Sequence, residues 1–202
     1  MTIRKPIAAL QKQAEKRNEN MEGGGAWRVM DFALYLILTM LIVFSVRNVL
    51  IDPIRVNGIS MLDTLLDGEI MMVDRLAYSF KEPARGDIVT CYYPDEYYEI
   101  TGKSYHTRVK RVVAEAGDTI EAHDGVLYVN GAAVEEPYLT EGRVGEMEIE
   151  RQTVPEGCCF VLGDNRSVSI DSRSPDVGPI PYPRIIGKVR MVVYPFKKAR
   201  LF

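Results

Sequence analysis

A charge-free run of mostly apolar residues, FALYLILTMLIVFSV from Phe32 to Val46, constrains this chain more than any other feature. The run is shorter than the roughly 20 apolar residues that cross a bilayer core as a helix. Its neighbours extend it to about that length if Asp31 and Arg47 reach toward the two interfaces. We therefore expect one transmembrane helix over residues 29–51.

A cleaved signal peptide would also show a basic flank and a short apolar run. Here the preceding region is about thirty residues long, and the VRNVLIDP stretch that follows offers no pair of small residues for cleavage. We therefore expect an uncleaved, single-pass anchor in the lipid of the plasma membrane.

The basic residues near the anchor predict its orientation. The four nearest basic residues before the run are Lys12, Lys16, Arg17 and Arg28, whereas only Arg47 and Arg55 follow it closely. By the positive-inside rule, residues 1–28 form a cytoplasmic tail and residues 52–202 an extracytoplasmic domain.

The outer part has the pattern of β structure. Short runs rich in β-branched, aromatic and apolar residues predict strands over 69–74, 87–92, 108–114 and 158–162, and DGVLYVNG (124–131) predicts a hairpin. No ten-residue helical stripe follows the anchor, so we expect a mainly β domain, an antiparallel sandwich or irregular barrel. Two stretches, residues 93–105 and 136–152, are expected to be solvated loops.

Composition excludes some classes of function. The net charge of −3, without a basic face, argues against nucleic acid as a partner. The three cysteines, Cys91, Cys158 and Cys159, lack C-x-x-C spacing and predict neither a zinc site nor a disulfide framework. We expect them to pack as small apolar side chains, and we expect no metal.

The stretch GISMLDTL, residues 58–65, supports two interpretations. Ser60 and Asp63, three residues apart before two leucines, form the pattern of a helix capping box. The same serine, in an apolar setting soon after a membrane segment, could instead be a nucleophile that acts on membrane-bound substrates.

A nucleophilic serine needs a base, and two residues are candidates. Lys110 lies in the apolar strand RVKRVVAEAGD, where burial would lower its pKa, although a lysine in such a strand usually points to solvent. His106, four residues earlier, would share its strand face, whereas His123 lies in a predicted turn. Neither face of the 108–113 strand is cleanly apolar, which is unusual for a half-buried strand.

A polar segment, GDNRSVSIDSR from Gly163 to Arg173, follows the apolar CCFVL. Its Asp and Asn side chains could simply bond their own backbone in a loop. Its two Asp–Arg combinations could equally form a bidentate ion pair that holds a site together.

Together these segments resemble the type I signal peptidases, membrane-anchored serine proteases that use a Ser–Lys dyad to remove signal peptides from exported proteins. GISMLDTL is similar to the nucleophile box, RGDIV to the next strand box, VKRVVAEAGD to the lysine box and VLGDNRSVSIDSR to the last box. GPIPYPRIIGKVRMVVYPF is similar to the closing segment. A single N-terminal anchor resembles the smaller, Gram-positive kind, and the resemblance implies signal peptides of exported preproteins as substrates and no cofactor.

The resemblance implies roles for individual residues. Ser60 would be the nucleophile, with its backbone N–H in the oxyanion hole, and Lys110 the general base. Met61 would line the shallow pocket for the small residue before the scissile bond.

Three residues of the last box would have supporting roles. Ser169 would hydrogen-bond and orient the Lys110 amine. Asp171 and Arg173 would pair and hold the loop against the site.

The nucleophile box departs from the family pattern twice. Gly58 stands where many relatives have a serine that helps to hold the oxyanion, and Asp63 stands in place of proline. A carboxylate beside Lys110 would weaken the base, so we expect Asp63 to face away and to cap a turn. Two alternatives use the same residues: an inactive relative that serves as a binding or assembly factor for surface proteins, and a self-cleaving repressor with a Ser–Lys dyad. The anchor and the absence of a helix-turn-helix pattern argue against the repressor.

Overall fold

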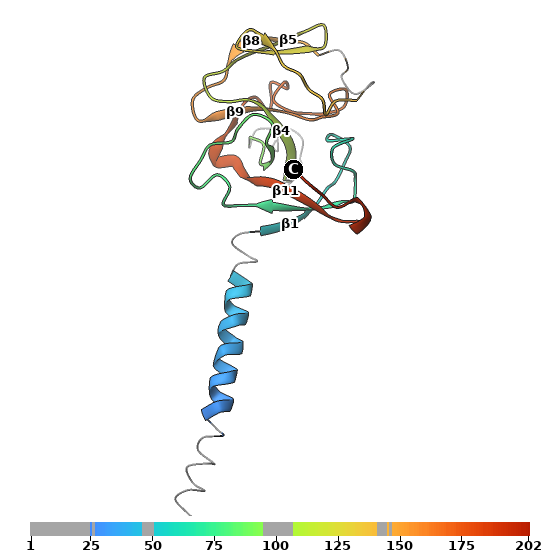
Figure 1. The fold of residues 1–202 in the computed structure, drawn as a ribbon. Coiled ribbons are helices and arrows are strands. Elements are labelled where there is room, and N and C mark those ends of the chain that lie inside the picture. Colours follow the sequence, from blue (N-terminus) through green and yellow to red (C-terminus); the bar gives the residue numbers. More distant parts are fainter. Residues whose placement is uncertain (1–24, 26, 46–50, 95–106, 141–144, 146) are drawn as a thin grey trace, which may run out of the picture. The chain divides into compact units, whose positions relative to one another are not determined.

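The structure is a computed structural model that describes residues 25, 27–45, 51–94, 107–140, 145 and 147–202 (Figure 1). The expected cytoplasmic tail up to residue 24, Arg47, His106 and most of the 93–105 stretch lie outside the described residues. The chain divides into two units, Met1–Asn48 and Val49–Phe202, which are described separately.

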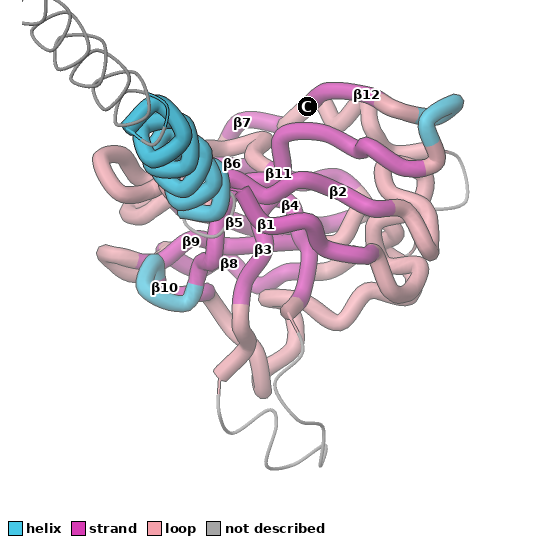
Figure 2. Tube along the Cα trace, turned by 90° about the horizontal axis from the view of Figure 1, so that it is seen from below, coloured by secondary structure: helices cyan, strands magenta, loops and turns pink. Residues whose placement is uncertain are grey.

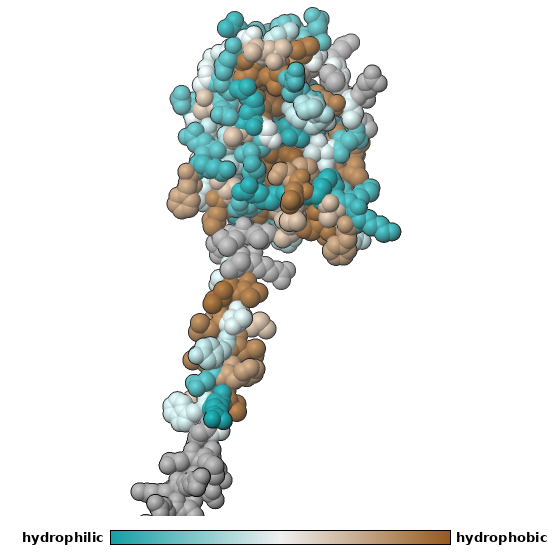
Figure 3. All heavy atoms as spheres, in the orientation of Figure 1, coloured by the Kyte–Doolittle hydropathy of each residue, from teal (hydrophilic) through white to brown (hydrophobic). Residues whose placement is uncertain are grey.

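In its described residues, the first unit forms the helix Trp27–Ser45, of 19 residues. At about 1.5 Å per residue it is about 28 Å long, and by length and apolar composition it could cross a bilayer core. Its side chains are exposed and mostly apolar (Figure 3). Residue 51, expected to end the anchor, already belongs to a strand of the second unit.

The second unit is built on a curled antiparallel sheet. Its strands are β1 (Ile51–Arg55), β2 (Ile70–Asp74), β3 (Ile88–Cys91), β4 (Arg108–Ala114), β9 (Cys158–Leu162), β10 (Ile180–Pro181), β11 (Ile185–Tyr194) and β12 (Arg200–Leu201). They pair in the order β1-β2-β11-β3-β4-β9-β10, with β12 added to β11 (Figure 2). Two short 3₁₀ turns, Tyr182–Arg184 and Phe196–Lys198, flank β11.

A second, smaller sheet has the order β7-β6-β5-β8. Its strands are β5 (Thr119–His123), β6 (Val126–Val129), β7 (Ala132–Ala133) and β8 (Ile149–Thr153). The DGVLYVNG segment forms β6 between two tight turns, where Asp124 and Asn130 have positive φ of 53° and 54° and each is followed by glycine. The predicted hairpin is therefore confirmed.

Strand β4 belongs to the large sheet and its C-terminal end also packs against the small sheet, which explains its mixed pattern. In Figure 1, β4 and β9 lie between β11 on one side and β5 and β8 on the other. Val113 and Ala114 pack with the small sheet, whereas Val112 packs with β3 and β9. Because β4 contacts apolar groups on both faces, two of its polar side chains, Lys110 and Arg111, are buried as well.

The mainly β fold class is thus confirmed, but one expectation about its loops is wrong. Residues 136–152 are not simply a solvated loop, because the end of this stretch enters β8 and Met147 is fully buried. The sequence did not indicate strand β8, because its apolar residue stands among Glu and Arg and four of its five side chains are exposed.

Candidate active site

The hydroxyl of Ser60 and the amine of Lys110 form the centre of the site. Lys110 Nζ donates a hydrogen bond of 2.8 Å to Ser60 Oγ. Lys110 is only 3% exposed, and this burial lowers its pKa from 10.5 to about 8, against the opposing charge of Asp171. A lysine with this pKa is neutral in about a tenth of molecules at neutral pH, enough to act as a base.

Ser60 lies in a compact turn between β1 and β2. The Leu62 N–H donates to Ile59 O, and the Leu65 N–H donates to Met61 O at 2.8 Å. No helix follows, and the Ser60 hydroxyl contacts Lys110 rather than capping a helix. The capping-box interpretation of GISMLDTL is therefore wrong.

The two departures in this turn have local explanations. Gly58 has φ of +101°, a conformation that glycine adopts without strain and serine does not. The Asp63 carboxylate accepts a hydrogen bond of 2.6 Å from the Thr140 hydroxyl. The main carboxylate acting on Lys110 is instead Asp171.

The segment after β9 packs directly against the nucleophile turn. The Asn165 N–H donates to Ser60 O at 3.0 Å, and the Asn165 side chain donates to Ile59 O. Gly163 makes this close approach possible, since a Cβ there would lie 2.5 Å from Ser60 O and 2.2 Å from Ser169 Oγ. Glycine is required at this position by space.

Asp171 and Arg173 form a bidentate ion pair, with Arg173 Nε 2.8 Å and Nη2 3.0 Å from the carboxylate oxygens. Asp171 also accepts a hydrogen bond from the Gly163 N–H. The pair thus holds the peptide that packs on Ser60.

Ser169 lies near the dyad, but its hydroxyl makes no hydrogen bond to the Lys110 amine in this structure. Its Oγ is buried and has no hydrogen-bond partner among the described residues. The predicted orientation of the Lys110 amine by Ser169 stays a prediction.

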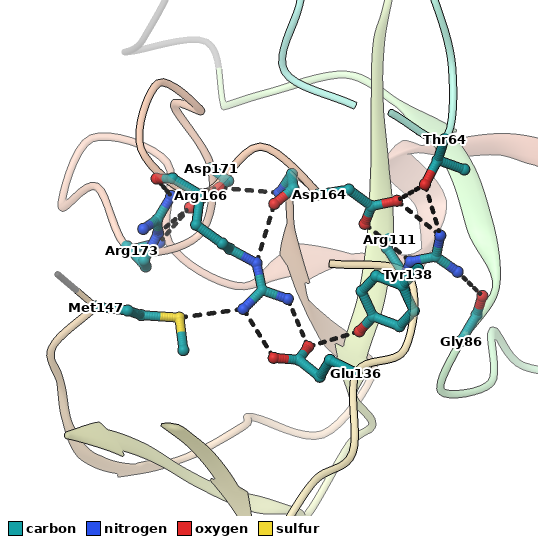
Figure 4. Close-up of polar contacts among 11 residues, drawn as sticks. Thr64, Gly86, Arg111, Glu136, Tyr138, Met147, Asp164, Arg166, Asp171 and Arg173 are labelled. Atoms are coloured by element: carbon teal, nitrogen blue, oxygen red, sulfur yellow. Dashed lines mark hydrogen bonds and ion pairs between the residues drawn. The ribbon is translucent and has the colours of Figure 1, made fainter. Parts of the chain in front are cut away.

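Sequence reasoning missed a buried polar network behind the dyad (Figure 4). Arg111 makes a bidentate pair with Asp164, at 2.9 Å and 2.7 Å, so Asp164 pairs across the structure and not with its neighbour Arg166. Arg166 binds Glu136 instead. The charges of Arg111 and Asp164 were visible in the sequence, but not that these residues, 53 positions apart, would meet.

A cavity of about 580 Å³ opens beside the dyad. Its lining comes from the nucleophile turn, β1, β4 and the segment after β9: Ile54, Arg55, Val56, Asn57, Gly58, Ser60, Met61, Tyr93, Thr107, Arg108, Val109, Lys110, Val168 and Ile170. Met61 is 2% exposed and packs in the apolar core between β2 and β11 while lining the cavity. An extended peptide laid in this cavity would pass the Ser60 hydroxyl.

The remaining candidates lie elsewhere. His123 stacks on Tyr128 in the hairpin, at 4.4 Å between ring centroids. Cys91 and Cys159 are buried and unpaired, and burial raises the pKa of the Cys91 thiol to about 12. Within the described ranges, no group of three or more His, Cys, Asp or Glu side chains could hold a metal ion.

A serine hydroxyl bonded to a buried lysine of lowered pKa, beside an open cleft, is the arrangement of a serine hydrolase that uses a Ser–Lys dyad. The family model "Signal peptidase, peptidase S26" matches residues 29–194. The chain belongs to this family.

Relatives with established names agree. The chain is 32% identical over 198 residues to signal peptidase I T of Bacillus subtilis (strain 168), covering 92% of this chain and 97% of that one. It is 38% identical over 182 residues to signal peptidase I of Bacillus licheniformis, covering 85% and 92%. A crystal structure of a signal peptidase I from Enterococcus faecalis V583 is 31% identical and covers 54% of this chain and 97% of that chain, with a TM-score of 0.42.

The chain is thus an enzyme, a serine peptidase that removes signal peptides. Its apolar N-terminal helix is consistent with membrane anchoring.

Proposed function

We propose that Ser60 is the nucleophile and Lys110 the general base of this peptidase. The observation that carries the proposal is the 2.8 Å hydrogen bond between a buried lysine and the serine hydroxyl. Neutral Lys110 accepts the Ser60 proton as Oγ attacks the peptide carbonyl carbon. The resulting ammonium returns this proton to the leaving amine when the C–N bond breaks.

An acyl-enzyme ester then links the signal peptide to Ser60. Lys110 accepts a proton from water, the hydroxide oxygen attacks the ester carbon, and the proton returns to Ser60 Oγ as the C–O bond breaks. The Ser60 backbone N–H, with a second donor, stabilises the oxyanion in both steps.

The substrate is the signal peptide of an exported preprotein. Met61 lines the pocket for the small residue before the scissile bond, which is supported by its place in the cavity beside Ser60. Ser169 orients the Lys110 amine, and Asp171 and Arg173 hold the loop, a role supported by their bidentate pair.

The chain is oriented with its N-terminus in the cytoplasm and residues 52–202 outside the plasma membrane. The excess of basic residues before the helix supports this orientation. Membrane lipid surrounds the helix Trp27–Ser45, and Ser60 follows within fifteen residues of its end, within reach of the surface where a cleavage site emerges.

The experiment is cleavage of a preprotein that carries a small-x-small site, by the full chain in detergent micelles. We expect wild type to release the mature protein and both Ser60→Ala and Lys110→Ala to be inactive while folded. A folded wild-type chain that cleaves nothing would contradict the proposal and favour a binding or assembly role.

A further inference from the structure

Tyr138 lies at the junction of the two buried arginines behind the dyad. Its ring stacks on the guanidinium of Arg111, with Cζ 3.8 Å from the ring centroid. Its hydroxyl donates a hydrogen bond of 2.6 Å to Glu136, whose carboxylate binds Arg166. The segment between β7 and β8 of the small sheet thus contacts both arginines at once (Figure 4).

Each arginine lies next to, or binds a neighbour of, a different member of the dyad. Arg111 follows Lys110 on β4 and pairs with Asp164, whose side chain is fully buried. Arg166 Nε donates to Gly163 O at 3.0 Å, and Gly163 packs against the Ser60 carbonyl. Tyr138 itself contacts neither reacting side chain, so any effect on catalysis must pass through these pairs.

The charges around Lys110 come from several elements. They are Asp164 and Asp171 from the segment after β9 and Arg108 from β4 itself, while the Cys91 thiol on β3 also faces the amine but stays neutral, because its pKa is about 12. Asp164 favours the ammonium form of Lys110, and its effect is limited because Arg111 neutralises it at 2.7 Å. A guanidinium free to move away from Asp164 would leave that carboxylate to act on Lys110.

The aromatic ring limits this movement. The attraction between a guanidinium and an aromatic face is stronger where the pair is shielded from water, and the Arg111 side chain is only 10% exposed. Its other contacts, to Gly86 O and Thr64 Oγ1, are longer, at 3.1 Å and 3.5 Å. The ring covers one face of the Arg111 guanidinium, which the hydrogen bonds in the guanidinium plane leave open.

We propose that Tyr138 is a positioning residue of the peptidase reaction. Its ring holds the Arg111 guanidinium against the Asp164 carboxylate and thereby favours the neutral amine of Lys110. The inference rests on the proposed role of Lys110 as the base. Loss of the ring raises the pKa of Lys110, because Asp164 then acts on the ammonium with less compensation.

The test is the pH dependence of kcat/KM for full-length chains cleaving a peptide with a small-x-small site. For Tyr138→Leu we expect the acidic limb to move up by about half to one pH unit. The loss of kcat/KM is then about 3–10-fold near neutral pH and within about twofold in the alkaline plateau. Tyr138→Phe keeps the ring, so its limb stays within about 0.2 unit of wild type.

Tyr128→Leu is the matched control, because Tyr128 lies on the small sheet and stacks on His123 rather than on an arginine. Its limb should coincide with that of wild type. Tyr138→Met, whose longer and more flexible side chain adapts better to an irregular space, serves as a second ring-free variant should the leucine variant not fold.

Two results would overturn the inference. One is an equal loss of kcat/KM at all pH values in the ring-free variants, which marks a merely structural role. The other is an acidic limb of kcat/KM that coincides with that of wild type in these variants. Activity of Lys110→Ala in the same assay would instead overturn the proposed base, so the two failures are distinguishable.

Discussion

The burial that leaves part of Lys110 as the neutral amine near neutral pH also destabilises the folded state. Its pKa is about 8 in the fold and 10.5 in the unfolded chain, so below about pH 8 both states carry the ammonium and the folded one holds it desolvated. Between about pH 8 and 10.5 only the unfolded chain keeps the proton, and stability rises with pH. The full cost, about 3 kcal/mol, therefore applies below about pH 8.

We expect Lys110→Met to abolish cleavage and to raise the free energy of unfolding near neutral pH by a few kcal/mol, about 2–3. This gain should shrink as the pH rises toward about 10.5. Thermal unfolding of the full chain at several pH values measures it. Lys81→Met, at an exposed lysine, is the control and should show no such pH-dependent gain. An equal gain at all pH values would mean that Met packing, not charge, is responsible.

The two carboxylates Asp63 and Asp171 should affect the pH profile differently. Asp171 is the largest electrostatic contribution that raises the pKa of Lys110, so Asp171→Asn should move the acidic limb of kcat/KM down by about half a pH unit or more. Asp63 accepts its hydrogen bond from Thr140. Asp63→Asn and Asp63→Pro should therefore leave the limb in place. A downward move of a unit or more for either Asp63 variant would show that this carboxylate does act on the dyad.

At the scale of elements, the close packing of the nucleophile turn on the segment after β9 depends on Gly163. A Cβ there would overlap Ser60 O and Ser169 Oγ, and the two segments would have to separate. We expect Gly163→Ala to lower kcat at least about 100-fold and to cost about 1–3 kcal/mol of stability. Gly157→Ala is the control: its φ of +71° makes alanine costly in stability there, but no atom lies within 4 Å of a Cβ, so activity should be kept. Equal loss of activity in both variants would contradict the argument.

Sequence patterns predicted the strands that are rich in apolar residues and pair without interruption over most of their length. Residues 108–114 and 158–162 form β4 and β9 with the expected bounds, and β2 and β3 are only slightly shorter than predicted. Strand β11 was not predicted, because two irregularities against β2 break its alternation. Strand β8 was missed because four of its five side chains are exposed, so hydrophobic periodicity gave no signal.

The residues of the candidate site could likewise be predicted only in part from the sequence. Ser60 and Lys110 were identified through motifs, which record local sequence. Partners such as Tyr138 for Arg111, and Glu136 for Arg166, join distant segments through side-chain geometry. Charge composition shows that such pairs must exist when charges are buried, but only the fold determines which residues form them.

At the scale of the whole molecule, the chain consists of a β-rich peptidase unit and an N-terminal unit with one apolar helix. A peptidase of signal peptides needs its site on the side of the membrane where the cleavage site emerges. In the proposed topology, the orientation of the helix is therefore as necessary for function as the geometry of the dyad, and the positive-inside rule assigns it to basic residues outside the peptidase unit.

This dependence gives the last prediction. Protease added outside intact cells that express the full chain should digest residues 52–202, while a tag at the N-terminus stays protected until the cells are lysed. Replacing Lys12, Lys16, Arg17 and Arg28 by Gln leaves Arg4 and Lys5 before the helix against Arg47 and Arg55 after it. The charge difference is then gone, so part of the population should invert and resist digestion. The control replaces Lys197 and Lys198, far from the helix in sequence, by Gln, and its digestion should match that of wild type. Digestion of the wild-type peptidase unit only after lysis would place it in the cytoplasm and contradict the proposed orientation.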